Sequence, residues 1–483
     1  MLIMLNIWVG RSRAVKTDVS RRELLAAGGA GVIAVAGAGP ARAKGAVEAD
    51  VAIVGAGLSG LMAAALLEEA GARVVVLEGA RRVGGRAYTL TDLPGKPEAG
   101  GIQIGSNYAR LIALAKRHDI PLVPGGEFDR TALYHIRGET LTDAQWPTAT
   151  ANLLTGAERA VPPAALGMVF ARRMPHLANT SAWRGGKGHA LDTAYDTALR
   201  AAGASDEAIR LIASNMDRGN LAHYSALNPA RSAAFFALSQ PGSLRVIAGG
   251  SQRLVEAAAA SLSNPPRLGQ IVTGISEGAT GVRIAIAGGG SLFARHVICT
   301  IPFAAMRGIA LDGPSAAAMK PAIAALPYTH ASFAYISATE PFWNSDGLPR
   351  MIWSDDPLIG RVFVLGDDPA MLKVWLSGAD ADAIDRADPR EAGATIIARL
   401  EAARPSAKGK LRLERMFSWQ REPMARGVYH HIGTGQQALL ARAVVAAGKR
   451  LHFAGEHLAQ EASGMEGALE SGERAAREII AKL

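Results

Sequence analysis

The stretch from residue 51 to residue 70 constrains the fold of this chain more than any other. Val51 to Val54 are four apolar residues with no polar face, which is typical of a buried parallel strand. Gly55, Gly57 and Gly60 follow at the spacing G-x-G-x-x-G, and a helix is expected from about Ser59 to Ala70. A strand, a tight glycine turn and a helix in this order favour a site that binds a dinucleotide, because unpaired N–H groups at the helix N-terminus attract phosphate.

The next residues complete a β-α-β unit. Gly71 stands where a left-handed residue ends a helix, and Arg73 to Leu77 predict a second strand. Glu78 follows directly, about 20 residues after the glycines, where an acidic residue accepts hydrogen bonds from a ribose. We expect Gly57 to let the diphosphate approach the backbone and Gly60 to let the helix pack on the strand.

A second glycine and arginine cluster indicates which dinucleotide is bound. Glu78, Arg82, Gly84, Gly85 and Arg86 match the motif E-x-x-x-R-x-G-G-R. The chain therefore resembles the flavin amine oxidase superfamily, which includes monoamine oxidases, polyamine oxidases and L-amino-acid oxidases. The resemblance implies FAD as the cofactor.

Further segments resemble those that hold FAD in this superfamily, in the same order along the chain. They are the run from Glu98 to Gly105, the return segment that begins at Gly249, the strand at Val272, and two C-terminal runs, 451–456 and 464–472. By resemblance, the candidate cofactor-binding residues are Gly55, Gly57, Gly60, Glu78, Arg82, Gly85, Arg86, Gly101, Ile102, Val272, Gly455, Glu456 and Met465.

The segments expected to face the substrate depart from the superfamily. Many relatives carry Trp where this chain has Gln103, and several L-amino-acid oxidases place an arginine for the substrate carboxylate nearby. The lysine that many relatives hold through a water to the flavin N5 falls at Phe333, and no lysine is near it in the sequence. Tyr429 matches one wall of the aromatic cage around the amine, whereas the opposite wall falls at Gly464. His330 is a further candidate for the active site, and we expect no metal site.

The N-terminus predicts export. Ser20-Arg21-Arg22 begins a twin-arginine pattern, which an Ala/Gly-rich apolar run and the small-x-small site Ala41-Arg42-Ala43 follow. This pattern resembles a bacterial Tat signal, removed near Ala43, so we expect a periplasmic protein that the Tat machinery exports after it has folded. The six Lys/Arg and two Asp/Glu of residues 1–43 supply +4 of the formal charge of +9. The remaining +5 over so long a chain favours no nucleic-acid partner.

The composition, with 483 residues and 49% of them hydrophobic, allows two or three cores. The single cysteine, Cys299, excludes an internal disulfide framework, and we expect it to be a buried apolar residue. By resemblance we expect an α/β, two-domain flavoprotein with a doubly wound, Rossmann-like FAD domain and an α+β substrate domain with a mixed sheet and a helical roof. The expected segments are a signal peptide (1–43), FAD-domain segments (48–106, 240–305, 411–483) and substrate-domain segments (107–239, 306–410).

The resemblance implies an FAD-dependent oxidoreductase that takes hydride from the carbon next to an amine and forms an imine. Val428 stands where mammalian monoamine oxidases carry the cysteine that links the flavin, so we expect FAD to be bound non-covalently. An L-amino-acid oxidase and a carbon–carbon desaturase or isomerase of the same fold stay open, as does a flavin-carrying protein without turnover. Oxygen, a quinone or a cytochrome could accept the electrons. We expect no membrane anchor, and a homodimer is also open.

Overall fold

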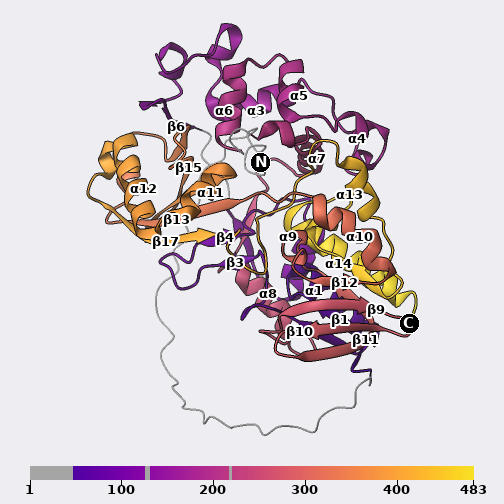
Figure 1. The fold of residues 1–483 in the computed structure, drawn as a ribbon. Helices are drawn as coiled ribbons and strands as arrows, with labels where there is room; N and C mark the ends of the chain where they lie inside the picture. Colours follow the sequence, from indigo (N-terminus) through magenta and orange to yellow (C-terminus); the bar gives the residue numbers. More distant parts are fainter. Residues whose placement is uncertain (1–46, 126–130, 217–219) are drawn as a thin grey trace, which may run out of the picture.

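A computed structural model describes residues 47–125, 131–216 and 220–483. The expected signal, residues 1–43, lies outside the described residues. The chain forms two lobes, each built on a seven-stranded sheet, with a layer of helices above the second sheet in the view of Figure 1. The two-domain α/β fold expected from the sequence is confirmed.

The first sheet has a parallel centre and an antiparallel extension. β1 pairs in parallel with β2 and β11, and β11 also pairs in parallel with β18. β9, β10 and β11 form an antiparallel meander. The strands are β1 (Ala49–Val54), β2 (Val74–Leu77), β9 (Val272–Glu277), β10 (Val282–Ile286), β11 (Gly290–Cys299), β12 (Ala310–Asp312) and β18 (Leu451–Phe453).

Helices cover both faces of this sheet, as a doubly wound fold requires. On one face, Val51 and Ile53 share a core with α1 (Leu58–Glu69), α2 (Ala109–Arg117), α8 (Ser251–Ala260) and α14 (Gly464–Ile480). On the other face lie α9 (Phe303–Met306), α10 (Pro314–Ala325) and α13 (Gln437–Ala443). The expected boundaries of the first helix hold to within one residue, and Gly71 has the expected positive φ of 84°.

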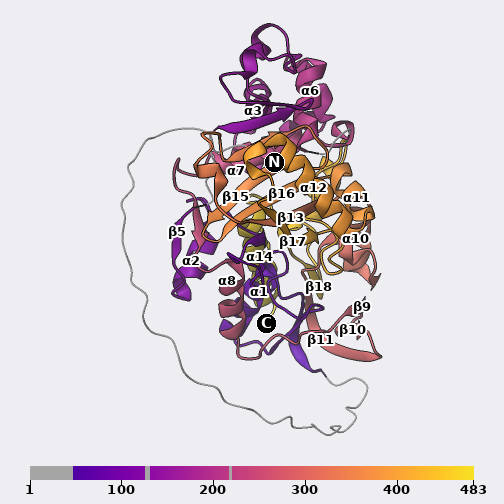
Figure 2. The ribbon, with the colours of Figure 1, turned by 90° about the vertical axis from the view of Figure 1, so that its left-hand side faces the viewer.

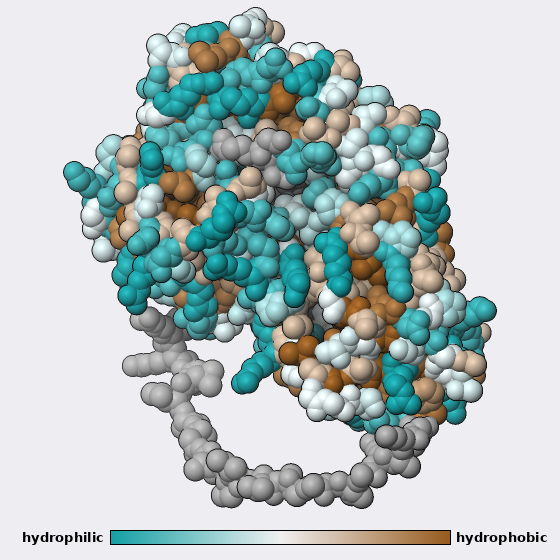
Figure 3. Space-filling model, in the orientation of Figure 1, coloured by the Kyte–Doolittle hydropathy of each residue, from teal (hydrophilic) through white to brown (hydrophobic). Residues whose placement is uncertain are grey.

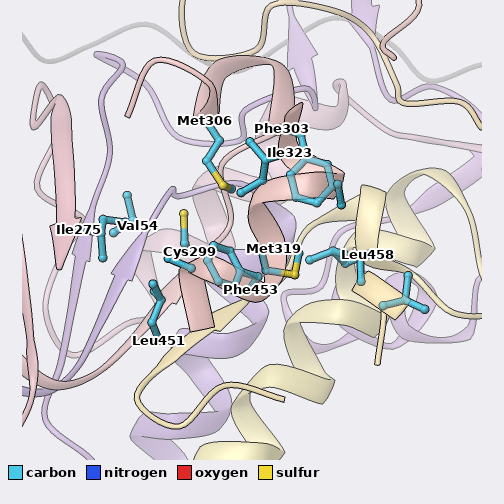
Figure 4. Close-up of a cluster of buried hydrophobic side chains, with 14 of the residues drawn as sticks. Val54, Ile275, Cys299, Phe303, Met306, Met319, Ile323, Leu451, Phe453 and Leu458 are labelled. Carbon is cyan, nitrogen blue, oxygen red and sulfur yellow. The ribbon is translucent and has the colours of Figure 1, made fainter. Parts of the chain in front are cut away.

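Figure 4 shows the core of the second face, where the side chain of Cys299 lies among Val54, Met306, Phe453 and their neighbours. Cys299 is fully buried, and burial raises the pKa of its thiol to about 12. The expectation that Cys299 is a buried apolar residue is therefore confirmed.

The second sheet is mixed and carries the expected helical roof. Its order is β17-β13-β16-β15-β14-β6-β7, and only β14 and β6 are parallel neighbours. Its strands are β6 (Ala132–Ile136), β7 (Glu139–Leu141), β13 (Ala331–Ala338), β14 (Met351–Ser354), β15 (Arg361–Asp367), β16 (Ala370–Ser377) and β17 (Leu411–Ser418).

The two faces of this sheet have different neighbours. One packs on α11 (Ala379–Arg386) and α12 (Pro389–Ala403), which Figure 2 shows in orange in front of the sheet. The opposite face meets the first lobe near Tyr335 and Phe417, and the helical roof near Tyr134 and Trp353. The roof contains α3 (Pro163–Ala171), α5 (Tyr195–Ala201) and α6 (Asp206–Ser214).

Three expected segment boundaries fall too early. Helix α2, assigned to the substrate domain, packs on α14 in the core of the first sheet. Strand β12 and helix α10, expected beyond residue 305 in the substrate domain, belong to the first lobe. Strand β17, assigned to the FAD domain, pairs with β13 in the second sheet. In each case the chain continues for one or two elements before it crosses to the other lobe.

Figure 3 shows the surface in the same orientation, with hydrophilic residues over most of the upper lobe and hydrophobic residues gathered mainly on the lower one. Within the described ranges, no helix combines the length and the apolar character that crossing a bilayer requires.

Candidate active site between the two sheets

A cavity of about 470 Å³ lies where the parallel strands of the first sheet end. Ligands of doubly wound folds bind at this edge, because the strands end there and the helices begin. The residues that follow four of these strands line the cavity: Gly55 after β1, Glu78 after β2, Thr300 after β11 and Gly455 near the end of β18. Four segments that are far apart in the sequence thus meet at one site.

Two helices begin at this cavity. Gly57 precedes the first residue of α1, and Met465 lies in the first turn of α14, and both line the cavity. The start of a helix presents free N–H groups and a partial positive charge, which suit a diphosphate or an electron-rich ring. Gly60 does not line the cavity: a Cβ atom there would lie 2.0 Å from the carbonyl oxygen of Gly55. Its role is to let α1 pack on the turn, as its place in the motif predicts.

The other predicted cofactor residues line the same cavity. They are Gly55, Gly57, Glu78, Arg82, Gly85, Arg86, Gly101, Ile102, Val272, Gly455, Glu456 and Met465. Gly101 has a φ of 56°, and a Cβ atom there would lie 3.0 Å from the sulfur of Met465. The backbone can therefore run close to α14 only because this residue is glycine.

Charged side chains at this end of the cavity are held by the protein. The carboxylate of Glu78 accepts hydrogen bonds from the backbone N–H groups of Ala56 (2.7 Å) and Ala80 (2.8 Å). Arg86 donates to Glu456 at 3.2 Å. Burial raises the pKa of Glu456, but His430 and Arg86 outweigh it and lower the pKa to about 2. Glu456 is therefore ionised, and Arg82, stacked on Tyr88 at 3.6 Å, supplies a further cation at the cavity wall.

Side chains of the second lobe hold the strand that crosses the cavity, β4 (Glu98–Gly100). The carbonyl oxygen of Glu98 accepts hydrogen bonds from Tyr335 (2.9 Å) and from Nζ of Lys373 (3.0 Å). Trp419 donates to the carbonyl of Ala99 at 2.9 Å. The segment that the resemblance places beneath the flavin is therefore positioned by the substrate sheet.

Lys373 is the most unusual side chain of the site, and the sequence analysis missed it. It is 2% exposed, lines the cavity, and lies on β16 next to Tyr335 of β13. Its amino group is 3.9 Å from the centre of the Phe333 ring and 5.0 Å from that of Trp375. Burial lowers the pKa of Lys373 to about 7, and burial also raises the pKa of the Glu98 carboxyl to about 7.

The position of Lys373 changes the interpretation of the lysine that is missing at Phe333. Phe333, a candidate site residue from the sequence, is fully buried and does not line the cavity, so the structure does not bring it to the site. The amino group of Lys373 instead reaches over its ring from the neighbouring strand. No lysine lies near position 333 in the sequence, but Lys373 lies next to Phe333 in the folded protein. The sequence carries one sign of this buried lysine: it is the only charged residue of the otherwise largely apolar strand AMLKVWLS (370–377).

The prediction for His330 is wrong. Its side chain is 39% exposed and contacts Asp382 of α11 at 2.7 Å, on the face of β13 that points away from the cavity. Alternation explains the error, because a residue that neighbours the site in sequence can face the opposite side of the sheet.

Tyr429 and Gln103 both line the cavity, as expected of substrate-facing residues. Burial raises the pKa of Tyr429, which is therefore a neutral hydroxyl at physiological pH. Gly464 also lines the cavity, and a Cβ atom there would lie 3.4 Å from the hydroxyl of Tyr108. The wall left open by Gly464 is thus approached by a tyrosine from another segment, which the sequence analysis did not identify.

FAD fits these residues. The glycine turn and Arg82 line the cavity and offer donors for a diphosphate, and Glu78 has free acceptor capacity for a ribose. Met465, at the start of α14, lies beside Gly101 at the same cavity. Bound there, FAD would supply the capacity to accept a hydride.

Comparisons with known proteins identify the family of the chain. The family model for flavin containing amine oxidoreductases matches residues 58–480, and the chain therefore belongs to this family. An L-amino-acid oxidase of Mus musculus is 26% identical over 461 residues, which span 89% of this chain and 70% of that protein. An amine oxidase [flavin-containing] B of Homo sapiens is 39% identical over 94 residues, 19% of this chain and 18% of that protein.

Solved structures share the fold over most of the chain. Cyclohexylamine oxidase from Brevibacterium oxydans aligns with a TM-score of 0.74 and 24% identity, over 90% of this chain and 99% of that one. Putrescine oxidase bound to putrescine aligns with a TM-score of 0.71 and 23% identity, over the same shares. The chain is thus an FAD-dependent oxidoreductase of the amine oxidase type, and the expectations of a flavin and of an amine-oxidising enzyme are confirmed.

Proposed function

We propose that this protein oxidises a small amine to an imine with non-covalent FAD, passes the electrons to oxygen, and acts in the periplasm. The observation that carries the proposal is the meeting of the FAD-type glycine turns with a cavity wall of Tyr429, Trp375 and Phe363. A cofactor that takes hydride and a largely apolar chamber beside it are the two requirements for oxidising a neutral amine.

The chain's own contribution is positioning and desolvation. The aromatic wall orients the C–H bond of the substrate and excludes bulk water, and an apolar chamber lowers the pKa of the bound amine. The neutral amine then needs no side chain to remove its proton. The imine that leaves is hydrolysed by water.

Lys373 favours oxygen as the electron acceptor. The lysine of relatives is associated with oxygen reactivity, and this chain brings a buried amino group to the cavity from β16. A cation in a poorly solvated site stabilises the negative charge that develops when oxygen takes up electrons. A quinone or a cytochrome as acceptor would not require it.

Two features of the sequence support the remaining parts of the proposal. Val428 lines the cavity at the position of the linking cysteine and cannot form a thioether, which supports a dissociable FAD. The twin-arginine pattern at Arg21-Arg22 supports export of the folded, FAD-loaded protein.

Anaerobic flavin bleaching tests the function. The purified protein is mixed without oxygen with primary amines, amino acids and unsaturated carbon substrates, and the absorbance of oxidised flavin is followed before and after air is admitted. Bleaching by an amine and fast reoxidation support the proposal. Bleaching only by a carbon–carbon substrate would replace it with a desaturase, and slow reoxidation would reject oxygen as the acceptor. Precipitation with acid should release the whole of the FAD into the supernatant.

A further inference from the structure

Two methionine side chains form part of the cavity wall. Among the described residues that line the cavity, the methionines are Met424 and Met465, and both are partly buried. In each case the sulfur lies beside a glycine: a Cβ atom at Gly79 would lie 2.4 Å from the sulfur of Met424, and one at Gly101 would lie 3.0 Å from that of Met465. Both thioethers are therefore packed against backbone while their side chains border the cavity.

The two sulfurs lie at different ends of the cavity. Met465 packs beside Gly101, which directly follows the strand β4 that Lys373 binds. Met424 packs beside Gly79, which directly follows the carboxylate expected to bind the ribose. Because Lys373 is the group that favours reaction with oxygen, Met465 is the sulfur at the end of the cavity where oxygen would be reduced.

The surroundings of Met465 leave little room for a larger side chain. It lies in the first turn of α14 and packs on the core between this helix and the first sheet. Beside it, a Cβ atom at Gly101 would also lie 3.3 Å from the Cα atom of Ala87. An oxygen atom added to the sulfur must therefore displace backbone or enter the space of the ligand. Met424, by contrast, lies outside any helix or strand and follows the exposed Pro423, so it can turn toward solvent.

We propose that Met465 is a site of oxidative modification, at which hydrogen peroxide formed by the enzyme converts the thioether to a sulfoxide and lowers turnover. The inference rests on the proposed function, because reduction of oxygen by two electrons yields hydrogen peroxide. In the step, the O–O bond of the peroxide breaks and an S–O bond forms. The sulfur loses two electrons, and the second oxygen leaves as water with both protons.

The modification would act through the hold on FAD. A sulfoxide is polar, whereas the thioether is apolar, and at the start of α14 its oxygen competes with the cofactor for space. Methionine sulfoxide reductases restore the thioether, so the loss of activity would be reversible.

Added hydrogen peroxide tests the site without turnover. The FAD-loaded protein is treated with peroxide, sulfoxide at each methionine is measured by peptide mass spectrometry, and retained FAD is measured after gel filtration. We expect Met465 and Met424 to be oxidised at least about tenfold faster than Met306, which is fully buried. The loss of FAD should follow the oxidation of Met465 in time, and methionine sulfoxide reductases should restore FAD binding.

Two variants at the cavity form a matched pair. Met465→Leu and Met424→Leu nearly conserve volume, and each is compared with its own untreated rate and FAD content. Under peroxide, Met465→Leu should keep both, whereas Met424→Leu should lose both as the unaltered protein does. The proposal is overturned if FAD loss follows Met424, if the two variants are equally sensitive, or if Met465 is oxidised no faster than Met306. The time course in the unaltered protein decides the question even where Met465→Leu binds FAD poorly.

Turnover in air then tests the source of the peroxide. The protein oxidises an amine in the presence of excess catalase, which removes peroxide that has left the cavity. The ratio of oxidised Met465 to oxidised Met424 should be several-fold higher than with added peroxide. An unchanged ratio would overturn the internal source while amine oxidation stands. If turnover forms no peroxide, oxygen fails as the acceptor, and added peroxide still shows whether oxidation of Met465 releases FAD.

Discussion

The two walls of the cavity are built in different ways. The wall of the first lobe is mainly backbone: glycine turns and helix starts at residues such as Gly57 and Gly101, where any side chain would occupy the ligand's space or collide. The wall of the second lobe is made of side chains on adjacent strands, among them Lys373 and Trp375. The backbone wall suits a cofactor that is the same throughout the family. The chemistry of the side-chain wall can differ between members, because a functional side chain can come from one strand or from its neighbour, as Lys373 does here.

The largest effect should come from behind the backbone wall, at Gly60, which does not line the cavity but lets α1 pack on the glycine turn. Gly60→Val places a Cβ atom 2.0 Å from the Gly55 carbonyl and 3.2 Å from the Ile53 side chain. We expect the protein to lose more than about 4 kcal/mol of stability and to retain no FAD. Gly167→Ala is the control: it lies inside α3, where a Cβ atom meets nothing within 4 Å, and should gain roughly 0.5–1 kcal/mol. Urea unfolding and the flavin-to-protein ratio measure both.

Gly57 separates the packing role from the binding role. A Cβ atom there has its nearest neighbour at 3.9 Å, so the protein itself can accept a side chain. Gly57→Val should therefore fold with a nearly unchanged melting temperature but bind FAD about 10- to 100-fold more weakly, because the added group competes with the diphosphate at the start of α1. Unchanged FAD affinity in this variant would show that the cofactor does not approach this turn.

The side-chain wall can be tested by moving its lysine. Lys373→Met should slow reoxidation of the reduced protein by oxygen about 10²-fold, the scale of removing one preorganised charge. The double variant Phe333→Lys/Lys373→Phe returns the amino group to β13, conserves the two side chains and should recover most of this rate. Stopped-flow reoxidation measures both variants. If the double variant is as slow as Lys373→Met while it stays folded and FAD-loaded, the strand that carries the lysine matters, not only the space that it reaches.

Lys373 could not be predicted from the sequence because it contacts residues that are far from it along the chain. The glycine motifs are local: the contacts among Gly55, Gly57 and α1 lie within one short segment, and their spacing in the sequence therefore predicts their geometry. Lys373 and Phe333 are 40 residues apart and become neighbours only through the pairing of β13 with β16. No local pattern fixes that register, so the fold and the cofactor end could be predicted, whereas the substrate wall could not.

Tyr108 and Gly464 are likewise far apart in the sequence, so their proximity could not be predicted from it. The sequence assigned a missing cage wall to Gly464, but the Tyr108 hydroxyl approaches that point from a segment more than 350 residues away in the chain. The segment boundaries failed for a related reason. Helix α2 and strand β17 carry no motif, and only their packing partners reveal the lobe to which they belong.

A smaller effect is expected from pH. Burial lowers the pKa of Lys373 to about 7, so its charge is present below pH 7 and is lost as the pH rises above it. Glu98 on β4 and Arg361 on β15 are the charged groups that act on it, and Tyr335 on β13 is a neutral neighbour. Reoxidation by oxygen should therefore fall by up to about tenfold per unit above pH 7, whereas reduction by amines should rise with pH as the amine loses its proton. Reoxidation that is flat from pH 6 to pH 9 in the unaltered protein would contradict this assignment.

The smallest effect is expected at His330, which the sequence suggests as a site residue but which lies outside the cavity. His330 and Asp382 form a pair that is 39% and 40% exposed, on the side of β13 that faces α11, so solvent screens their interaction. His330→Asn should cost less than about 1 kcal/mol of stability and leave the flavin spectrum, bleaching and reoxidation unchanged. Lys373 lies on the opposite face of the same sheet, at the cavity, and its replacement should slow reoxidation. A large loss of bleaching in His330→Asn would mean that the two faces of the second sheet are coupled, and the division between a side-chain wall and a structural face would have to be abandoned.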